Sequence, residues 1–327
     1  MRRWTVSILG LLVVLHSAGY GATNLRITLR PVDTTHYSAR QWIMKGDSSR
    51  IQTRLDWLYD EPGFRPPRER AKVECANNRI IVTVSDTSGA ARVEYLTSSQ
   101  GRVSFRLVAA DSLAADVMDS ADNWVRRHPT GGLDSLNGVM WYRWSSLLVS
   151  DRDYPMAGKT LAGIDTLVFG DWRPMFGSLD TRRNDTSRTL YLVARQADIS
   201  NAQRNLFEHA EVHRSRGTRP PSAPPMPEET QPFFVHLWLT HDTLFGFDPV
   251  KKLAQVTSAH IRRRLAMTMD SFVLSAPMIQ DTISDGFFAV PTNDTLGTHA
   301  RDLATVLLGG PLFTPLVVER VERVRTY

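Results

Sequence analysis

The stretch LAMTMDSFVLSAPMI, residues 265–279, carries the strongest structural signal in this chain. Two apolar runs flank Asp270-Ser271, which predicts two strands joined by a tight turn. A helix is predicted downstream, because its apolar residues are spaced at i, i+3, i+4 and i+7: Ala300, Leu303, Ala304 and Leu307. Gly309-Gly310 ends that helix, and residues 316–321 predict a last strand.

The N-terminal part of the chain predicts a compact α+β unit over residues 24–108. Apolar alternation and turn residues give the order strand, helix, strand, strand, helix, strand. The strands are predicted at 25–29, 71–75, 80–84 and 103–107, with helices starting at Ser48 and at Ser88-Gly89. This order is the split βαβ, or ferredoxin-like, arrangement.

The middle of the chain is harder to interpret. Residues 111–127 could form a helix, and the tryptophans that follow suggest a packed segment, but no fold is assigned to 109–188. Further on, the pattern predicts a strand at 190–194, a helix at 198–208 and a strand at 233–239. The many prolines of residues 214–232 predict a loop between them.

These C-terminal patterns resemble the first periplasmic domain of the SecD family, a subunit of the bacterial protein-export machinery. The residues that match the family's motifs occur in the family's order, and a structural role is expected for them. They are Asp198, Asp270, Ala276, Pro277, Ile279, Ile283, Gly286, Ala300, Leu303, Ala304, Leu307, Gly310, Leu312 and Pro315. Three positions depart from the motifs: Ser271 and Asp285 stand in place of glycines, and Phe313 stands in place of a proline.

The resemblance implies an α+β fold in which a ferredoxin-like base subdomain carries an inserted α+β head subdomain. We expect the base at residues 23–108, the unassigned insertion at 109–188, the head at 189–312 and a closing strand at 313–327. The family's transmembrane bundle would follow about where this sequence stops, at Tyr327. The family's membrane carboxylate and arginine are therefore not expected here, and neither is a proton-driven motor.

The first 22 residues predict an export signal. Arg2 and Arg3 precede an apolar run at 6–15, and small residues follow up to Ala22. The apolar run is too short to span a membrane comfortably. We expect a protein of the periplasm or cell envelope. The alternative that the segment is not cleaved and tethers the protein to the inner membrane remains open. The single cysteine, Cys75, lies in a strand-like pattern and is expected to be a small buried residue.

Charge and motif spacing argue against two further classes of function, nucleic-acid binding and nucleotide binding. The 39 basic and 34 acidic residues leave a net charge of +5, and the basic residues do not cluster beside aromatic residues, so no nucleic-acid partner is expected. Gly158-Lys159-Thr160 imitates the end of a phosphate-binding loop, but Asp153 stands where the first glycine belongs.

Other candidate sites are equally incomplete. His209 and His213 are spaced i, i+4 with Glu211 between them, so a helix would place both imidazoles on one side. The order is not His-Glu-x-x-His and a proline-rich loop follows, which favours a solvated helix end over a zinc site. A solvated helix face is also predicted for four carboxylates: Asp111, Asp116, Asp119 and Asp122. We therefore expect no catalytic residue, no cofactor and no metal.

The leading hypothesis is a non-enzymatic, exported protein that binds polypeptide, either a translocating preprotein or an envelope partner such as a translocase subunit. A structural envelope module that has lost its ligand is the first alternative. A hydrolase with its site in residues 109–188 is the second.

Overall fold

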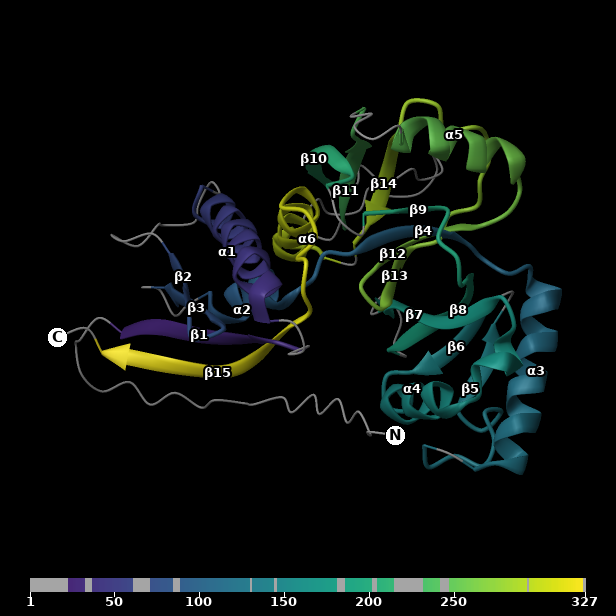
Figure 1. Cartoon of the computed structure of the whole chain (residues 1–327). Helices are drawn as coiled ribbons and strands as arrows, with labels where there is room; N and C mark the ends of the chain where they lie inside the picture. The colour runs from purple at the N-terminus through teal and green to yellow at the C-terminus, as the bar shows by residue number, and fades with distance from the viewer. Residues whose placement is uncertain are drawn as a thin grey trace.

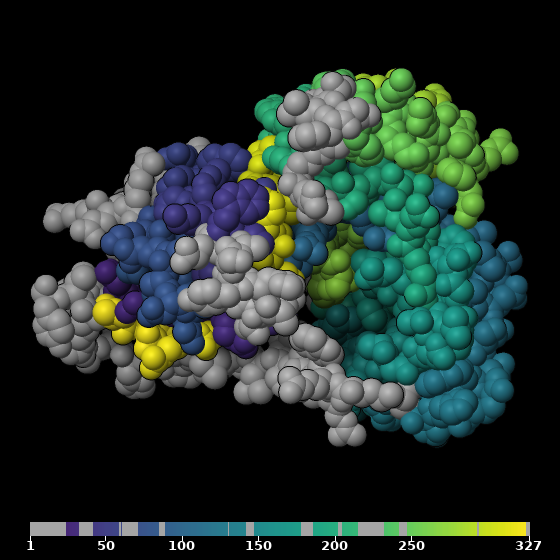
Figure 2. Space-filling model, in the orientation of Figure 1, coloured from purple at the N-terminus to yellow at the C-terminus, as the bar shows by residue number. Residues whose placement is uncertain are grey.

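The computed structural model describes most of the chain: residues 23–32, 37–60, 71–84, 89–129, 131–143, 146–180, 186–201, 205–214, 232–241, 247–292 and 294–325. The expected export signal at 1–22 lies outside the described residues, as does all of the expected proline-rich loop except its two end positions. The described residues form three β-sheets with helices packed on them, so the predicted α+β class is confirmed (Figure 1). In Figure 2 the purple and blue N-terminal atoms gather on one side, the teal atoms on the other and the green atoms at the top.

The first sheet is the base, with strand order β15-β1-β3-β2 and antiparallel neighbours throughout. Its strands are β1 (Thr23–Pro31), β2 (Lys72–Ala76), β3 (Arg79–Val84) and β15 (Leu316–Arg325). Helix α1 (Tyr37–Tyr59) contacts β2 and β3, and helix α2 (Ala90–Ser98) contacts β1 and β15. Taken in chain order this is the ferredoxin-like arrangement that the sequence predicts.

The strand that completes the base is not the predicted one. Residues 103–107 form β4 (Val103–Leu107), which lies in a different sheet, and β15 takes the fourth place beside β1. Val103, Ser104 and Phe105 are all buried, so both faces of β4 are covered, as in a central strand of a large sheet. The base is therefore built from both ends of the described chain.

Two further predictions in the base are wrong. Helix α1 begins at Tyr37 and not at Ser48. Cys75 is exposed, because β2 is the edge strand of its sheet and most of its side chains face solvent.

The second sheet has the order β5-β6-β8-β7-β13-β12-β4-β9. Its other strands are β5 (Met140–Arg143), β6 (Ser146–Ser150), β7 (Trp172–Asp180), β8 (Ser187–Ala194), β9 (Ile199–Ser200), β12 (Leu265–Met269) and β13 (Phe272–Ser275). The segment 109–188, whose fold the sequence leaves open, supplies β5, β6 and β7 together with α3 (Asp111–Arg127), α4 (Tyr154–Gly163) and the 3-10 helix η1 (Thr166–Phe169). Together with β8, these elements enclose an apolar core around Val125, Val149 and Leu190.

The third sheet has the order β10-β11-β14. Its strands are β10 (Phe207–Arg214), β11 (Phe233–Leu239) and β14 (Phe287–Pro291), and α5 (Pro249–Ala259) precedes β12 along the chain. Helix α6 (Thr298–Leu308) contacts β10 and β11 as well as α1 and α2, so it lies between this sheet and the base (Figure 1). Its predicted apolar face is buried.

The predicted helix at 198–208 is wrong, because the chain there forms β9 and the start of β10. The backbone N–H of Asp198 donates to the Phe105 carbonyl at 2.9 Å, and the Asn201 side chain accepts from the Val103 N–H at 2.7 Å. These bonds to β4 hold the segment extended, and they cannot be read from local sequence spacing. The helix α5 was not predicted either.

A single buried arginine joins the base to the rest of the molecule. The Arg54 guanidinium, on α1, donates to the carbonyl oxygens of Ser99 at 2.7 Å and Gly310 at 2.6 Å, which lie on the segments that leave and re-enter the base. It also donates to the Leu96 carbonyl at 3.0 Å. Burial lowers the pKa of Arg54 to about 10, so the group still carries its charge at neutral pH.

Two more residues of α1 hold the re-entering segment. The Asp47 carboxylate accepts the backbone N–H groups of Phe313 at 2.6 Å and Thr314 at 3.2 Å. Arg50 donates to the Pro311 carbonyl, and its guanidinium lies 3.9 Å from the centre of the Phe313 ring. Residues one and two helical turns apart on α1 therefore fix how the base and the other sheets meet.

Candidate functional site

The outer surface of the β10-β11-β14 sheet carries a cluster of rings, which we call the aromatic face. The inward side chains of β11, Val235, Leu237 and Leu239, are buried in the core. Since side chains alternate along a strand, the residues between them point outward. The aromatic face consists of His209, Glu211 and His213 on β10, His236 and Trp238 on β11, and Phe287 on β14.

The rings of the aromatic face touch one another across the three strands. His213 lies 4.5 Å from His236, and His209 lies 4.9 Å from Trp238, measured between ring centres. Phe287 lies 5.0 Å from Trp238 and 5.3 Å from His236. These spacings are those of favourable aromatic pairs, so the rings form one continuous layer on a sheet surface.

Glu211 lies between the two histidines of β10 and pairs with both imidazoles. Its carboxylate is 2.9 Å from Nε2 of His209 and 2.7 Å from Nε2 of His213. Hydrogen bonds from the two histidines lower the pKa of Glu211. The pKa of His236 is also lowered, first by burial and then by repulsion from His213, so this imidazole is neutral at pH 7.

The two histidines that the sequence places on a helix therefore lie on a strand. On β10 these residues and Glu211 are two positions apart, so all three side chains share one side of the sheet. The predicted helix would have brought only the two histidines to one side. The hypothesis of a solvated helix end is wrong. Within the described part of the chain, no group of three His, Cys, Asp or Glu side chains is placed to hold a metal ion.

The strands on either side of the aromatic face each pair on one side only within the described residues. β10 and β14 both pair with β11, which leaves their outer edges as rows of backbone donors and acceptors. Such edges can pair with an extended chain from another molecule. The site thus offers a ring-covered surface bounded by two strand edges.

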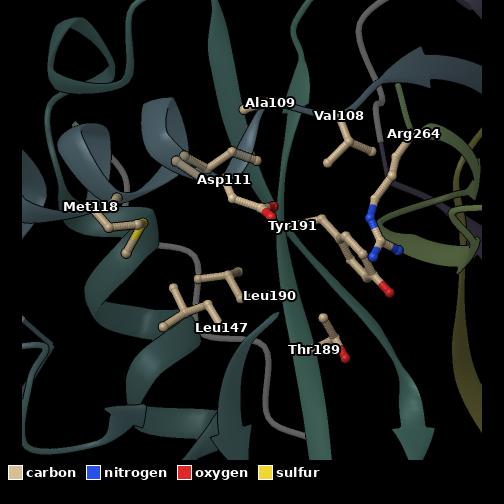
Figure 3. A pocket seen from close by; sticks show the side chains of 12 residues that line it. Val108, Ala109, Asp111, Met118, Leu147, Thr189, Leu190, Tyr191 and Arg264 are labelled. Atoms are coloured by element: carbon tan, nitrogen blue, oxygen red, sulfur yellow. The ribbon is translucent and has the colours of Figure 1, made fainter. Parts of the chain in front are cut away.

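A cavity of about 250 Å³ lies elsewhere, beside the first turns of α3 (Figure 3). It opens beside β8, at the point where this strand changes its neighbour. Leu190 of β8 pairs with Leu147 of β6. The carbonyl of Leu192, two residues further on, accepts the N–H of Ala109 at 2.9 Å. Its lining is mostly apolar: Val108, Ala109, Ala114, Ala115, Met118, Leu147, Leu190 and Leu192. Four polar residues complete it: Asp111, Thr189, Tyr191 and Arg264.

Two oppositely charged residues, Asp111 and Arg264, line the polar side of the cavity. Figure 3 shows the Asp111 carboxylate and the Arg264 guanidinium approaching the cavity from different directions, with the Tyr191 ring beside the guanidinium. Burial raises the pKa of Tyr191, so its hydroxyl stays protonated and can donate. Arg264 donates to the Ala276 carbonyl at 3.3 Å and has N–H groups to spare.

A smaller cavity of about 40 Å³ lies in the part of the chain that matches the SecD motifs. Pro277 and Ile283 line it, together with residues of α5, β12 and β14. The N–H of Ile283 also donates to Thr257 Oγ1 at 3.0 Å, which ties this loop to α5. The cavity is too small for more than a water-sized group.

The motif residues themselves form turns and core contacts. Asp270 has a positive φ of 56°, and its carboxylate accepts the Arg102 N–H at 3.0 Å while burial raises its pKa. Gly286 and Gly310 also have positive φ values, of 68° and 73°. The remaining buried motif residues are Ala276, Ile279, Ala300, Leu303, Ala304, Leu307 and Leu312. None of the motif residues belongs to the aromatic face.

Sequence reasoning did not identify the aromatic face or the larger cavity. The face has a signal in the sequence, because His209, Glu211 and His213 alternate, as do His236 and Trp238. A spacing of two residues places all of these side chains on one side of a strand, whereas on a helix only the i, i+4 pair His209 and His213 would share a face. The cavity has no such signal, since its walls come from segments far apart in the chain.

Comparison with known proteins identifies part of this fold. Residues 245–314 match the family model described as SecDF, P1 head subdomain. The chain is 45% identical over 74 residues to the protein translocase subunit SecD of Magnetococcus marinus, a match that covers 22% of this chain and 14% of that protein. It is 36% identical over 74 residues to the SecD subunit of Syntrophobacter fumaroxidans, covering 23% of this chain and 14% of the relative.

A crystal structure of SecDF in its super-membrane-facing form aligns with 93% of this chain and 30% of the solved chain, with a TM-score of 0.51 and 15% identity. At that identity the alignment shows a shared fold. The resemblance to the SecD periplasmic domain is thereby confirmed, although the matched sequence spans only a small part of the curated relatives. No helix among the described residues is long and apolar enough to cross a membrane.

Proposed function

We propose that this protein serves protein export as a non-enzymatic, polypeptide-binding protein of the periplasm or cell envelope. The SecD relatives are named as translocase subunits, which supports a role in export. Binding of an unfolded or exported polypeptide is our extension from that role to this chain. The aromatic face is the observation that carries it.

The chemistry of the aromatic face suits an unfolded chain. Rings such as Trp238 and Phe287 offer a large apolar surface that accepts many side chains without demanding one sequence. Within the described part of the chain β10 and β14 each pair with β11 alone, so their outer edges can offer backbone hydrogen bonds to an extended segment, and these are equally independent of sequence. A folded protein presents neither its backbone nor its core side chains, so the surface discriminates by conformation.

The other expectations for this chain become parts of the same proposal. We assign residues 189–312 to a head subdomain that carries the aromatic face, and the SecD-motif residues to a structural role. A translocase subunit or another envelope protein is a further candidate partner. Passive holding of the polypeptide, without a proton-driven motor, stays a prediction.

Binding to a permanently unfolded protein tests the proposal. Fluorescein-labelled, reduced and carboxymethylated α-lactalbumin is titrated with the full chain, and anisotropy reports the dissociation constant. We expect micromolar affinity, and no binding to native α-lactalbumin. Replacing Trp238 by serine removes the largest ring of the face and should weaken binding about fivefold or more.

Trp141→Ser is the matched control, because Trp141 is an exposed tryptophan on β5, in another sheet. It should bind like the wild type. Equal losses in the two variants would show that the aromatic face has no special role. Indifference of the wild-type chain to the unfolded protein would favour a structural envelope module.

A further inference from the structure

The cavity beside α3 lies outside the SecD-matched residues 245–314 except at Arg264. Its volume of about 250 Å³ falls below the range of roughly 300–1,000 Å³ that is usual for sites of cofactors and drug-sized ligands. Its walls are apolar side chains from α3, β6 and β8. A space of this size and character suits a side chain better than a whole cofactor.

The polar groups at the cavity restrict the occupant further. Asp111 and Arg264 carry opposite charges and line the same space. A fatty acid or another anion would be attracted by Arg264 but repelled by Asp111, and a cation would meet the reverse. The pair therefore favours a neutral group that both donates and accepts hydrogen bonds.

The peptide group is such a neutral group. Its N–H can donate to the Asp111 carboxylate, and its carbonyl oxygen can accept from Arg264 or from the Tyr191 hydroxyl. The Arg264 guanidinium has five donors, and among the described residues its side-chain hydrogen bond goes to the Ala276 carbonyl. An apolar side chain on the same residue would then fill the space between Met118, Leu147 and Leu190.

We infer that this cavity is an anchor site for one large apolar side chain, such as leucine, of an extended polypeptide whose peptide group lies between Asp111 and Arg264. The inference rests on the proposed function and adds a preference to it. The aromatic face accepts unfolded chains broadly, whereas the cavity selects segments that carry an apolar residue flanked by accessible backbone.

Short peptides with one guest residue measure that preference. A fluorescein-labelled peptide of serine and threonine carries leucine at its centre, and its partner carries serine there. Burying the leucine side chain should make the first peptide bind the full-length protein about 10- to 100-fold more tightly. Ala115→Leu, which fills the cavity, should remove most of that difference.

A second variant tests the polar contact by removing the carboxylate that lines the cavity. Asp111 is exposed in the first turn of α3, so Asp111→Ala should fold, and it should weaken the leucine peptide several-fold. Asp119→Ala is the matched control, since Asp119 is also exposed on α3 but does not line the cavity. Photo-leucine at the guest position should cross-link to the α3 and β8 residues of the wall.

Several results would overturn the inference. Cross-links that map away from α3 and β8, or an unchanged leucine preference in Ala115→Leu, would show that the cavity does not hold the side chain. Free leucine or octanoate that displaces the peptide at equal concentration would show that a small molecule is the occupant. If wild-type protein binds unfolded α-lactalbumin but fails these tests, only the anchor site is wrong. If it binds no unfolded protein, the proposed function is wrong as well.

Discussion

The Arg54 guanidinium donates to the carbonyl oxygen of Gly310 at 2.6 Å, although the two residues are 256 positions apart in the sequence. Arg54 lies on α1, and Gly310 lies on the segment between α6 and β15. The same guanidinium donates to the Ser99 carbonyl, on the segment that leaves the first sheet after α2. One side chain therefore binds both connecting segments. Helix α1 therefore contacts both of the segments that connect the first sheet to the rest of the molecule.

The first prediction concerns the hydrogen bonds of the Arg54 guanidinium. Arg54→Met should lower the free energy of unfolding by about 3 kcal/mol or more, because buried carbonyl oxygens lose their charged donor. Urea unfolding monitored by circular dichroism measures the loss. Arg152→Met, at an exposed turn, is the control and should change stability by less than about 0.5 kcal/mol. A small effect at Arg54 would mean that water replaces the guanidinium.

The second prediction concerns the titration of His236. Its pKa should lie below 6.5, the usual value, and His213→Gln should raise it because the repulsion from His213 is lost. Glu211→Gln should lower it further, since the carboxylate attracts the imidazolium. Two-dimensional NMR of the imidazole protons measures the midpoints.

The sign of the stability effect follows from that shift. The folded state binds the His236 proton more weakly than the unfolded state, so this residue makes the fold less stable as pH falls from about 6.5 through its lowered pKa. His236→Gln should remove that part of the pH dependence. A midpoint above 6.5 in the wild type would contradict the packing described for the aromatic face.

The third prediction concerns Gly286, whose φ of 68° lies in the left-handed region. A Cβ atom at this position would lie 2.8 Å from a methyl carbon of Val250. Gly286→Ala should cost at least about 1–2 kcal/mol of stability, as left-handed backbone alone costs this much. Gly138→Ala is the control, because a Cβ there meets nothing within 4 Å. Similar melting temperatures for the two variants would contradict the left-handed backbone and the close contact with Val250 described for Gly286.

The fourth prediction concerns Asp122, which the sequence places on a solvated helix face together with Asp111, Asp116 and Asp119. The structure buries it, and its carboxylate accepts the Leu136 N–H at 2.6 Å and the Arg126 guanidinium at 2.7 Å. Burial alone would raise its pKa, but the hydrogen bonds outweigh burial and hold the pKa below 3.8.

The contribution of Asp122 to stability is therefore present above about pH 4 and is lost as pH falls through its lowered pKa. Asp122→Asn should destabilise the protein by about 1–3 kcal/mol at pH 7 and flatten the acid limb of its stability curve. Asp119→Asn, on the exposed side of the same helix, should change neither quantity. Acid titration of the unfolding free energy compares the three proteins.

The sequence predicts what local spacing controls. The helix at 298–308, the α3 helix and the turn at Asp270 are confirmed, because each depends on residues within a few positions of one another. The assignment of β4 to the base and the helix at 198–208 are wrong, because pairing with β12 and the Asn201 side-chain bonds decide those segments from a distance. The cavity beside α3 could not be predicted for the same reason.

The pairing of β1 with β15 has a consequence for how the molecule is made. A chain that crosses a membrane or leaves a ribosome N-terminus first delivers β1 early and β15 late, so β1 lacks one neighbour while all the intervening residues emerge. The sheets of the inserted part have their strands within that interval and can assemble first, apart from the base. Folding is therefore expected to end with the slow pairing of β1 and β15. A translation arrest before residue 316 would leave the edge of β1 unpaired and sensitive to proteases.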